Sequence, residues 1–567
     1  MARRAALLSL AFALACANPE EEEPVRRDAG PDRDAGRVRD GGPRDGGARD
    51  GGSRDGGSRD AGSRDGGELV VPVSLAYTAA DEVGLRALFV TASSTTSYEV
   101  TPTLAGGPTI DSKGGPTGSG VFGFEWIEYG DGLIYEAQQD TYDRREIYFA
   151  FHPNARSERV TYKQSRSDAD GPTSGFGLFP TGRWHYFYQI DQSRTNFYIR
   201  HSGTSTASRR LNRGTVLGLS ISSADYVAYQ DIVVGGPSDD RDLWVASPSA
   251  EPFRVNAGAN VGFGGSMAWA PGGREIAYNA DERFSRVFEL YRYDVTFGGA
   301  GARELMFSPM QANADVTVGQ GSVQYSPANT HLAYLADADT DELVELYEID
   351  LTESPPRTQH KISGVFTAGA DGVDRFDYSP DGTYVAYVAD VDTLGLGELY
   401  VARSGMQEAV RMHPALAAGE RVIGERWLED DRIAFIVLGN GARRAFVADL
   451  ATFPPGPATE LSNPPFQFAA ANRSPSGRYV VYVDDASPRN LWMTDLTATP
   501  LTQTMVIANA TTWCWSFDDQ LAVITQPDGG DRTRLELIRD VAAPAPVWIR
   551  TPDDLNVLNC KFAPEGE

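Results

Sequence analysis

Residues 375–401, RFDYSPDGTYVAYVADVDTLGLGELYV, hold three short apolar segments separated by turn residues. The first segment ends at Tyr378 and is followed by Ser-Pro-Asp-Gly at 379–382. In a type I turn, proline fixes φ at the second position and glycine is favoured at the fourth. Apolar residues resume at 385–387 and, after a polar loop, at 398–401. The stretch therefore predicts three antiparallel strands of one small sheet, which cannot bury its faces without neighbours.

The same pattern recurs along the chain. After Trp269 and Tyr325 an alanine-tyrosine strand and a glutamate-leucine-tyrosine strand follow, and the copy after Arg473 has Val-Val-Tyr and Asn-Leu-Trp in these places. Weaker copies after Trp427 and Trp515 lack the proline. The positions before the turn are Trp269, Tyr325, Tyr378, Trp427, Arg473, Trp515 and Phe562, which lie 56, 53, 49, 46, 42 and 47 residues apart. A period of roughly 40–55 residues with several strands per unit is typical of a propeller blade.

The two ends of this repeat region complement each other. Residues 75–77 and 87–90 match the second and third strands of a unit that lacks its first, and residues 560–566 match a first strand and its turn. Propellers close in this way because a blade built from both ends leaves no free sheet edge.

Three diverged units, at 133–148, 179–198 and 227–244, bring the number to nine complete units and one shared unit. We therefore predict an all-β fold in which residues 69–567 form a β-propeller of up to ten four-stranded blades. One ring is favoured by the matching ends. Two smaller rings, or a diverged unit that is not a blade, are the alternatives, since rings usually have about four to eight blades.

Residues 1–15 have the parts of a secretory signal peptide: Arg3 and Arg4, an apolar run over 5–14 and a small residue at Ala15. Cys16 follows directly, an arrangement that resembles the lipobox of bacterial lipoproteins and implies lipidation of Cys16. Here Ala13 and Leu14 depart from the family's preferred residues. Ordinary cleavage that leaves an unmodified thiol is the alternative.

Residues 16–68 form the second predicted segment. Arg-Asp-Gly-Gly or Arg-Asp-Ala-Gly begins at 39, 44, 49, 54, 59 and 64. This repeat has no apolar side chain larger than that of alanine, so it cannot form a buried core. We expect a disordered tether whose ends lie about 40 Å apart on average. A tail that binds anions or polysaccharide is the alternative, although each arginine there has an aspartate beside it.

The composition narrows the classes of function. The chain has 567 residues and a net charge of −27, which argues against a nucleic-acid surface. It contains no motif of a serine-hydrolase elbow, a zinc protease or a P-loop, and no cofactor is predicted. The histidines are scattered singly over different units at His152, His185, His201, His331, His360 and His413. A nucleophile–histidine–acid site would form only if the fold happened to bring residues from different units together. We expect His185 to be a packed or channel-lining ring.

Carboxylates alternate at Asp337, Asp339 and Asp341, as they do in calcium loops. The glycine that an EF-hand turn needs is missing, and Glu345 and Glu348 fall where a strand is expected. We interpret the segment as a solvated acidic loop, because acidic loops recur at 484–485 and 528–531. No metal site is predicted.

Two cysteines remain besides Cys16. Cys514 and Cys560 fall in the first strands of neighbouring units, so a disulfide there would join the closing blade to its neighbour. This disulfide would close a loop of about 46 residues, and in the chain-entropy model it would stabilise the fold by roughly 4 kcal/mol. The alternative is a pair of buried thiols that pack as small apolar groups.

The repeat itself, aromatic-Ser-Pro-Asp-Gly followed by hydrophobic-Ala-Tyr and Glu-Leu-Tyr, resembles the WD40-like repeats of the TolB family, the periplasmic propeller of the Tol–Pal envelope system. The resemblance covers residues 266–539 well and 70–265 weakly. Similar repeats occur in the propellers of prolyl oligopeptidase-type peptidases and of some polysaccharide lyases. TolB carries an N-terminal α/β domain, and the Arg-Asp-Gly tract takes its place here, so the resemblance implies a fold and not TolB's role.

Together these observations predict an exported lipoprotein of the bacterial cell envelope, at the periplasmic or outer-membrane face, held to the membrane through its lipid anchor. We expect a non-enzymatic scaffold that binds an envelope protein or peptide, and acidic loops would suit a basic partner or cations. The alternative is a propeller-type hydrolase or lyase acting on polysaccharide or peptide. That activity would require carboxylates from different blades to lie close together on one face. A purely structural surface protein is the third hypothesis.

Overall fold

The computed structural model describes residues 70–567 apart from several short segments. These segments are 81–84, 94–96, 102–108, 111–115, 118, 128–131, 139–144, 152–160, 164–172, 192–193, 203–206, 233–240, 258–260, 262–266, 285, 297–302, 308–313, 320, 356, 440, 462–472, 485, 528–531, 550–555 and 564–567. Residues 69–567 form one compact unit. The predicted signal peptide, Cys16, the tether, His152 and the acidic loop at 528–531 lie outside the described residues.

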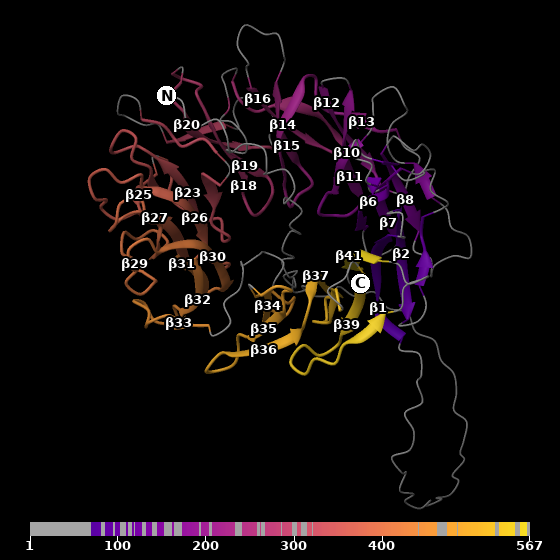
Figure 1. Cartoon of the computed structure of the whole chain (residues 1–567). Coiled ribbons are helices and arrows are strands. Elements are labelled where there is room, and N and C mark those ends of the chain that lie inside the picture. Colours follow the sequence, from indigo (N-terminus) through magenta and orange to yellow (C-terminus); the bar gives the residue numbers. More distant parts are fainter. Residues whose placement is uncertain are drawn as a thin grey trace, which may run out of the picture. The chain divides into compact units, whose positions relative to one another are not determined.

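The strands form a ring of ten blades, as Figure 1 shows. The prediction of a single β-propeller is therefore confirmed, and all three diverged units are blades. Within each blade the strands follow one another as an antiparallel meander, from the first strand at the channel to the last at the rim. Each sheet buries its faces against the sheets of the neighbouring blades.

The first five blades contain the following strands. Blade 1 has β41 (Asn556–Phe562), β1 (Val70–Ala80), β2 (Leu85–Ser93) and β3 (Ser97–Glu99), and blade 2 has β6 (Ser119–Trp126), β7 (Gly132–Ala137), β8 (Glu146–Phe151) and β9 (Thr161–Lys163). Between them lies a small hairpin, β4 (Thr109–Ile110) and β5 (Pro116–Thr117). Blade 3 has β10 (Thr173–Leu178), β11 (Trp184–Asp191), β12 (Arg194–His201) and β13 (Arg209–Arg210), and blade 4 has β14 (Thr215–Ile221), β15 (Val227–Ile232), β16 (Arg241–Ser247) and β17 (Ala250–Arg254). Blade 5 has β18 (Met267–Trp269), β19 (Glu275–Ala280), β20 (Glu289–Asp294) and β21 (Arg303–Phe307).

The other five blades complete the ring. Blade 6 has β22 (Val323–Tyr325), β23 (His331–Ala336), β24 (Glu345–Asp350) and β25 (Gln359–Lys361), and blade 7 has β26 (Val373–Tyr378), β27 (Tyr384–Ala389), β28 (Glu398–Arg403) and β29 (Ala409–Arg411). Blade 8 has β30 (Arg421–Glu429), β31 (Arg432–Gly439), β32 (Ala442–Asp449) and β33 (Thr459–Glu460). Blade 9 has β34 (Tyr479–Val483), β35 (Leu491–Asp495) and β36 (Thr502–Ile507), with a single bridge from Arg473 to Val480 in place of a first strand. Blade 10 has β37 (Ala510–Trp515), β38 (Leu521–Thr525), β39 (Arg534–Ile538) and β40 (Val547–Ile549).

Blade 7 shows how the repeat folds. The turn after β26 closes with a hydrogen bond from the Gly382 amide to the Ser379 carbonyl at 2.8 Å, and Gly382 has a φ of 74°. The Ser379 hydroxyl also accepts the Tyr384 amide at 2.9 Å, which starts β27. Glycine takes this left-handed conformation without steric cost, so the turn predicted at 379–382 is confirmed.

The same turn recurs after the first strand of seven blades. The residue at its fourth position has a positive φ in every case: Gly182, Asp225, Gly273, Asn329, Gly382, Gly477 and Asp519. Asparagine and aspartate tolerate this conformation better than other non-glycine residues. The turn at Asp225 was not evident from the sequence because it lacks both proline and glycine, whereas the turn at Asp519 follows Trp515, where the repeat predicts one.

The closing blade joins the two ends of the repeat region. β41 pairs antiparallel with β1, with Tyr77 opposite Cys560 and Leu75 opposite Phe562. The prediction that the C-terminal strand completes the N-terminal blade is therefore confirmed. In addition, β2 pairs in parallel with β6, which makes blades 1 and 2 one continuous sheet.

The core lies between blades rather than inside them. Tyr387 of β27 stacks on Tyr400 of β28 at 5.5 Å, and equivalent tyrosine pairs occur in blades 5 and 6 at 5.7 Å. The apolar cluster around Tyr387 also includes Ala333 and Leu346 from blade 6. Each blade thus depends on its neighbours for a buried core, as the small size of one sheet requires.

Candidate functional site

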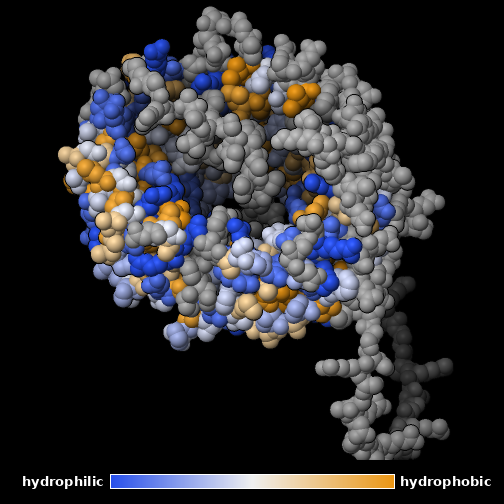
Figure 2. All heavy atoms as spheres, viewed as in Figure 1, coloured by the Kyte–Doolittle hydropathy of each residue, from blue (hydrophilic) through white to orange (hydrophobic). Residues whose placement is uncertain are grey.

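The meander gives the ring two chemically different faces. The turn face carries the turns between first and second strands and between third and fourth strands. The loop face carries the connections between second and third strands and the links from one blade to the next. Figure 2 shows hydrophilic and hydrophobic residues intermixed around the central opening.

Aspartates at the start of the loop-face connections serve the backbone. Four of them directly follow a second strand: Asp281, Asp337, Asp390 and Asp484. Each accepts an amide from later in its own loop, from Arg286, Glu342, Gly395 and Asn490, at 3.0, 3.3, 3.1 and 2.9 Å. These carboxylates replace backbone partners that the loop lacks. Asp337 is therefore a loop cap, which agrees with the interpretation of its segment as an ordinary acidic loop.

The glutamates of the third strands are also occupied within the fold. Glu289, Glu345 and Glu398 are buried and accept the hydroxyls of Tyr291, Tyr347 and Tyr400 at 2.6, 2.7 and 3.3 Å. Glu345 also contacts the Lys361 ammonium. Because their oxygens are taken up by donors inside the fold, we assign these glutamates a structural role.

Glu348 clasps blade 6 to blade 7. Its side chain is fully buried and accepts the Tyr378 hydroxyl at 2.5 Å, the Ser404 hydroxyl at 3.0 Å and the Gly405 amide at 2.5 Å. Burial, followed by the charge of Glu348, raises the pKa of Tyr378 well above its ordinary value. As expected from the sequence, Glu345 and Glu348 both lie in a strand, β24.

Six further carboxylates in the loops and links of blades 5 to 7 are exposed: Asp339, Asp341, Glu342, Asp371, Asp374 and Asp392. We define the acidic belt as residues 281–288, 314–322, 337–344, 362–374 and 390–397, from the loops and links of blades 5 to 7. These segments contain eleven carboxylates and two arginines, with no lysine or histidine. Burial and the neighbouring carboxylates Asp337 and Asp281 raise the pKa of Asp315, although the Phe288 amide bonds to it. Burial is the main cause of the rise, and the two neighbouring carboxylates add to it.

The same belt presents apolar side chains to solvent. The exposed fractions are 52% for Phe284, 42% for Val318, 90% for Val365 and 50% for Leu394. These are four of the eleven large apolar residues that are exposed in the described part of the chain. Exposed apolar groups rimmed by polar ones are typical of interaction sites.

Hydrogen bonds between neighbouring loops make the belt continuous. The link from blade 5 to blade 6 donates the Val316 amide to Phe288 and the Thr317 amide to Leu335, both at 2.9 Å. The next link donates the Val373 amide to Val344 at 2.8 Å, and its Thr367 hydroxyl bonds to the Val391 carbonyl at 3.0 Å. Each link therefore ties one loop to the loop of the following blade.

A pocket of about 560 Å³ opens between blades 7, 8 and 9 at the turn face. It is lined by Asp381, Thr383, Tyr384, Glu429, Asp430, Asp431, Leu450, Ala451 and Arg473. Burial, followed by the charges of Asp381 and Asp431, raises the pKa of Asp430. Burial alone would raise the pKa of Asp381 as well, but hydrogen bonds from Thr383 and Ser379 outweigh it and lower that pKa. Two carboxylates from different blades thus meet with pKa values displaced in opposite directions.

Comparable turn contacts elsewhere are structural. Thr181 of blade 3 donates its amide at 3.3 Å and its hydroxyl at 2.7 Å to Asp225 of blade 4. Ser476 of blade 9 donates its amide, at 3.0 Å, and its hydroxyl to Asp519 of blade 10. Asp381 holds the matching turn position in blade 7 and its amide bonds to Asp430 of blade 8. The pair is therefore a blade junction in which a carboxylate replaces the usual hydroxyl.

The histidines do not gather into a site among the described residues. His185 is fully buried in β11, stacks on Phe187 at 5.8 Å and shares a hydrogen bond with Ser202 at 3.2 Å. Burial, followed by the charges of Arg200 and His201, lowers its pKa to about 3. A neutral ring at physiological pH makes His185 a packing residue. No group of metal-ligating side chains and no helix able to cross a membrane occurs in the described part of the chain.

Cys514 and Cys560 form a disulfide, with their Cα atoms 6.1 Å apart. They lie in β37 and β41, the first strands of blades 10 and 1, as the alignment of the repeats indicated. The lipidation of Cys16 stays a prediction, because that residue lies outside the described part of the chain.

The acidic belt and the pocket were not predicted from the sequence. Two departures from the repeat pointed to the pocket: Asp430-Asp431 in place of the proline turn of blade 8, and Arg473 in place of the aromatic residue of blade 9. An aspartate directly after Tyr-x-Ala is the local signal of three of the four loop caps, Asp281, Asp337 and Asp390. No local signal marked Val365 and Leu394, because exposure depends on how the loops pack.

No family model matches the chain, and no curated protein matches its sequence. Among solved structures, one of the prolyl endopeptidases is similar over 66% of this chain at 9% identity, with a TM-score of 0.36. The match covers 54% of that protein, so the chain spans about half the endopeptidase's length. A eukaryotic initiation factor matches over 87% of this chain and 99% of its own, at 11% identity and a TM-score of 0.45.

A protein designated TolB from Agrobacterium tumefaciens matches over 47% of this chain and 87% of its own, at 14% identity and a TM-score of 0.26. The chain is a β-propeller similar in structure to TolB and prolyl endopeptidase propellers. Likenesses at these identities concern the fold and carry no function with them.

Proposed function

We propose that this chain is an exported, lipid-anchored and non-enzymatic scaffold of the cell envelope that binds a basic protein or peptide. The observation that carries the proposal is the acidic belt, where exposed apolar side chains lie among carboxylates on adjoining loops of blades 5 to 7. Loops on a rigid ring can vary and bind without disturbing the core. The N-terminal sequence supports export and anchoring through Cys16.

The charge of the belt argues for a basic partner. Asp341 and Glu342 are exposed at the tip of the blade 6 loop. Other carboxylates of the belt have cationic partners: Arg303 lies 2.9 Å from Glu282, and Arg375 lies 2.8 Å from Asp374. Asp392 is paired with Arg411 at 3.0 Å, and the Lys361 ammonium lies between Asp339 and Glu345. A lysine- or arginine-rich segment would be attracted to the remaining carboxylates, and its apolar side chains would cover Val365 and Leu394.

Affinity capture from envelope extract tests this proposal, with the bound proteins identified by mass spectrometry. Three forms of the full chain are compared: wild type, Asp341→Lys/Glu342→Lys, and the control Glu251→Lys/Glu353→Lys, which has the same change in charge on the turn face. We expect a stoichiometric basic partner on wild type and control, at least about tenfold less on the belt variant, and release by salt. A partner held equally by all three forms would contradict the assignment of the belt.

The anchor is tested separately, by labelling cells with a radioactive or clickable fatty acid. Wild-type protein should carry the label and sediment with membranes, whereas Cys16→Ser should carry none and stay soluble in the envelope fraction. An unlabelled wild-type protein would contradict lipidation and leave the assignment of the belt intact.

A hydrolase or lyase acting on polysaccharide or peptide is the second candidate. The opposite pKa displacements of Asp381 and Asp430 favour it, because acid and base pairs in enzymes are tuned apart in this way. Against it stands the structural role of the same contact at the Thr181 and Ser476 junctions. Turnover of added glycans or peptides by wild type, lost in Asp430→Asn, would support the enzyme. No turnover by the wild-type protein would leave the scaffold as the better account.

A further inference from the structure

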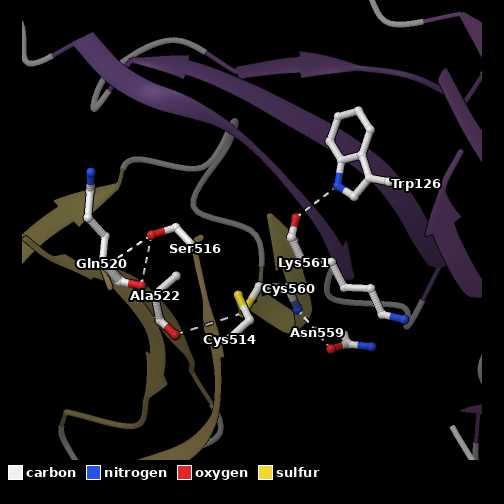
Figure 3. The surroundings of a disulfide bond; sticks show 8 residues. All are labelled: Trp126, Cys514, Ser516, Gln520, Ala522, Asn559, Cys560 and Lys561. Carbon is white, nitrogen blue, oxygen red and sulfur yellow. Dashed lines mark hydrogen bonds between the residues drawn. A yellow bond between two sulfur atoms is a disulfide. The ribbon is translucent and has the colours of Figure 1, made fainter. Parts of the chain in front are cut away.

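The disulfide occupies a particular place in the ring. In blade 7 and the other blades with a turn after the first strand, the chain continues directly from first to second strand. In blade 1 the first strand is β41 and the second is β1, which lie at opposite ends of the described residues. Figure 3 shows Cys560 of β41 beside Cys514 of blade 10, with the strands of the N-terminal blades on the far side of β41.

Noncovalent contacts hold β41 on both sides. On the side of blade 10, Thr533 donates its hydroxyl to the Val557 carbonyl at 2.6 Å. On the side of blade 2, the Trp126 indole donates to the Lys561 carbonyl at 3.1 Å, and the Lys561 ammonium pairs with Glu125. The disulfide adds a second covalent attachment of β41 to blade 10, besides the chain that leads into it from β40.

The two sulfur atoms differ in access. Cys560 is 3% exposed, lies in the apolar cluster between blades 10 and 1, and contacts the Ala522 carbonyl. Cys514 is only partly buried at the edge of the same cluster. Thiol–disulfide exchange requires the attacking thiolate to reach a sulfur atom, so exchange should begin at Cys514.

We propose that the Cys514–Cys560 disulfide is a redox latch on the ring, opened by a protein dithiol that attacks Cys514. The attacking thiolate forms a mixed disulfide with Cys514 as the Cys514–Cys560 bond breaks, and Cys560 leaves as a thiolate that takes up a proton. The second thiol of the reductant then displaces Cys514. The net result is a reduced protein and an oxidised dithiol.

Opening the latch loosens β41, whose partner β1 lies at the other end of the described residues and is joined to it by no turn. Without the cross-link, β41 can separate from β1 while the remaining blades keep their covalent turns. Its departure uncovers the edge of β1 at Leu75–Ala80, together with Tyr77 and Leu75 of the shared cluster. This regulation concerns the closure of the ring and goes beyond the proposed binding function, from which its test is independent.

Hydrogen exchange on the full-length protein tests the latch without any substitution. The oxidised protein and protein treated with dithiothreitol, without denaturant, are compared by mass spectrometry, and alkylation reports the redox state. We expect exchange in β41 and in residues 75–80 to rise about tenfold or more on reduction, and exchange in β26 and β27 to stay unchanged. Unchanged exchange in β41 after reduction, or reduction only when every blade unfolds, would overturn the proposal.

A trapping experiment tests the point of attack. A thioredoxin-type Cys-x-x-Cys protein with its second cysteine replaced by serine should form a mixed disulfide with Cys514, and an adduct on Cys560 would contradict the proposed route. The control variant Lys561→Met removes the ion pair with Glu125 and keeps the cross-link. We expect β41 to stay protected in the oxidised control. Loosening as large as that caused by reduction would show that the disulfide is not the latch.

Discussion

Blade 7 and blade 1 are the same four-stranded unit closed in two different ways. In blade 7 the turn at 379–382 connects β26 to β27, so the first strand pairs with a partner that follows directly in sequence. In blade 1 the partners β41 and β1 are separated by almost the whole propeller, and they pair through Leu75–Ala80. The register and the buried alternation are alike in both blades. The difference shows that packing and strand pairing define a blade, whereas its covalent turn can be replaced by ring closure.

Deletion of residues 556–567 is the strongest test of that comparison. It removes the partner of β1 and exposes Tyr77 and Leu75, so we expect the free energy of unfolding to fall by roughly 5 kcal/mol or more. Urea denaturation measures the change. The matched change in blade 7, Pro380→Gly/Asp381→Gly, keeps the covalent turn and should cost about 1 kcal/mol. Equal losses would mean that closure contributes no more than an ordinary turn.

Glu348→Ala probes a boundary that is held by a side chain instead of a cross-link. The substitution leaves the Tyr378 hydroxyl, the Ser404 hydroxyl and the Gly405 amide without their acceptor. We expect a loss of about 3 kcal/mol in the free energy of unfolding, since buried donors without partners are costly. The exposed Glu408→Ala is the control and should leave stability unchanged. A neutral Glu348→Ala would show that the clasp does not secure blade 6 to blade 7.

His185 extends the comparison to the diverged blade 3 and predicts a dependence on pH. Its pKa of about 3 in the folded protein lies below the ordinary 6.5, first because of burial. Stability from this group is complete above pH 6.5 and is lost as the pH falls, because the unfolded chain takes up the proton first. The loss is about 1.4 kcal/mol per pH unit until the pH reaches the folded pKa. His185→Phe should have a shallower slope between pH 6 and 4 in urea denaturation, and equal slopes would refute this assignment.

Asp381→Ser should have the smallest effect. It gives the junction of blades 7 and 8 the hydroxyl that Ser476 supplies at the junction of blades 9 and 10. We expect a net change of only a few tenths of a kcal/mol at neutral pH, because loss of the hydrogen bonds from Ser379 and Thr383 offsets the relief of Asp430 and the site is largely solvated. The raised pKa of Asp430 means that protonation of this carboxyl favours the folded state. In Asp381→Ser the pKa of Asp430 should fall toward its ordinary value, so the variant should gain less stability from acid than the wild type. Carbon-13 NMR titration of Asp430 measures the pKa, and an unchanged value would rule out Asp381 as a cause.

Much of the architecture was predictable because each of its features depends on a few adjacent residues and recurs in several blades. The turn at 379–382, the tyrosine strands and the complementary ends each rest on a few adjacent residues, and repetition averaged out their individual ambiguity. The turn at Asp225 and the contact of Asp430 with Asp381 escaped prediction for the opposite reason. Each is a single departure from the repeat, and its conformation is imposed by the neighbouring blade.

The candidate sites were less predictable. Asp381 and Asp430 are separated by about one repeat in the sequence, and only their common place on the turn face brings them together. Val365 looks like any strand or loop valine until the link to blade 7 leaves it exposed. Side-chain exposure and contacts across blades depend on the ring, which no local pattern describes.

The sequence by itself determined that this protein is built of short antiparallel sheets with tight turns, and that its last strand completes its first blade. These features follow from backbone preferences and apolar alternation, which act over a few residues. The tertiary structure alone decided that ten blades share one ring, which carboxylates are buried as structural partners, and which remain exposed on the belt. Those outcomes depend on how neighbouring sheets twist and pack, and so on contacts between residues about fifty positions apart or at opposite ends of the chain.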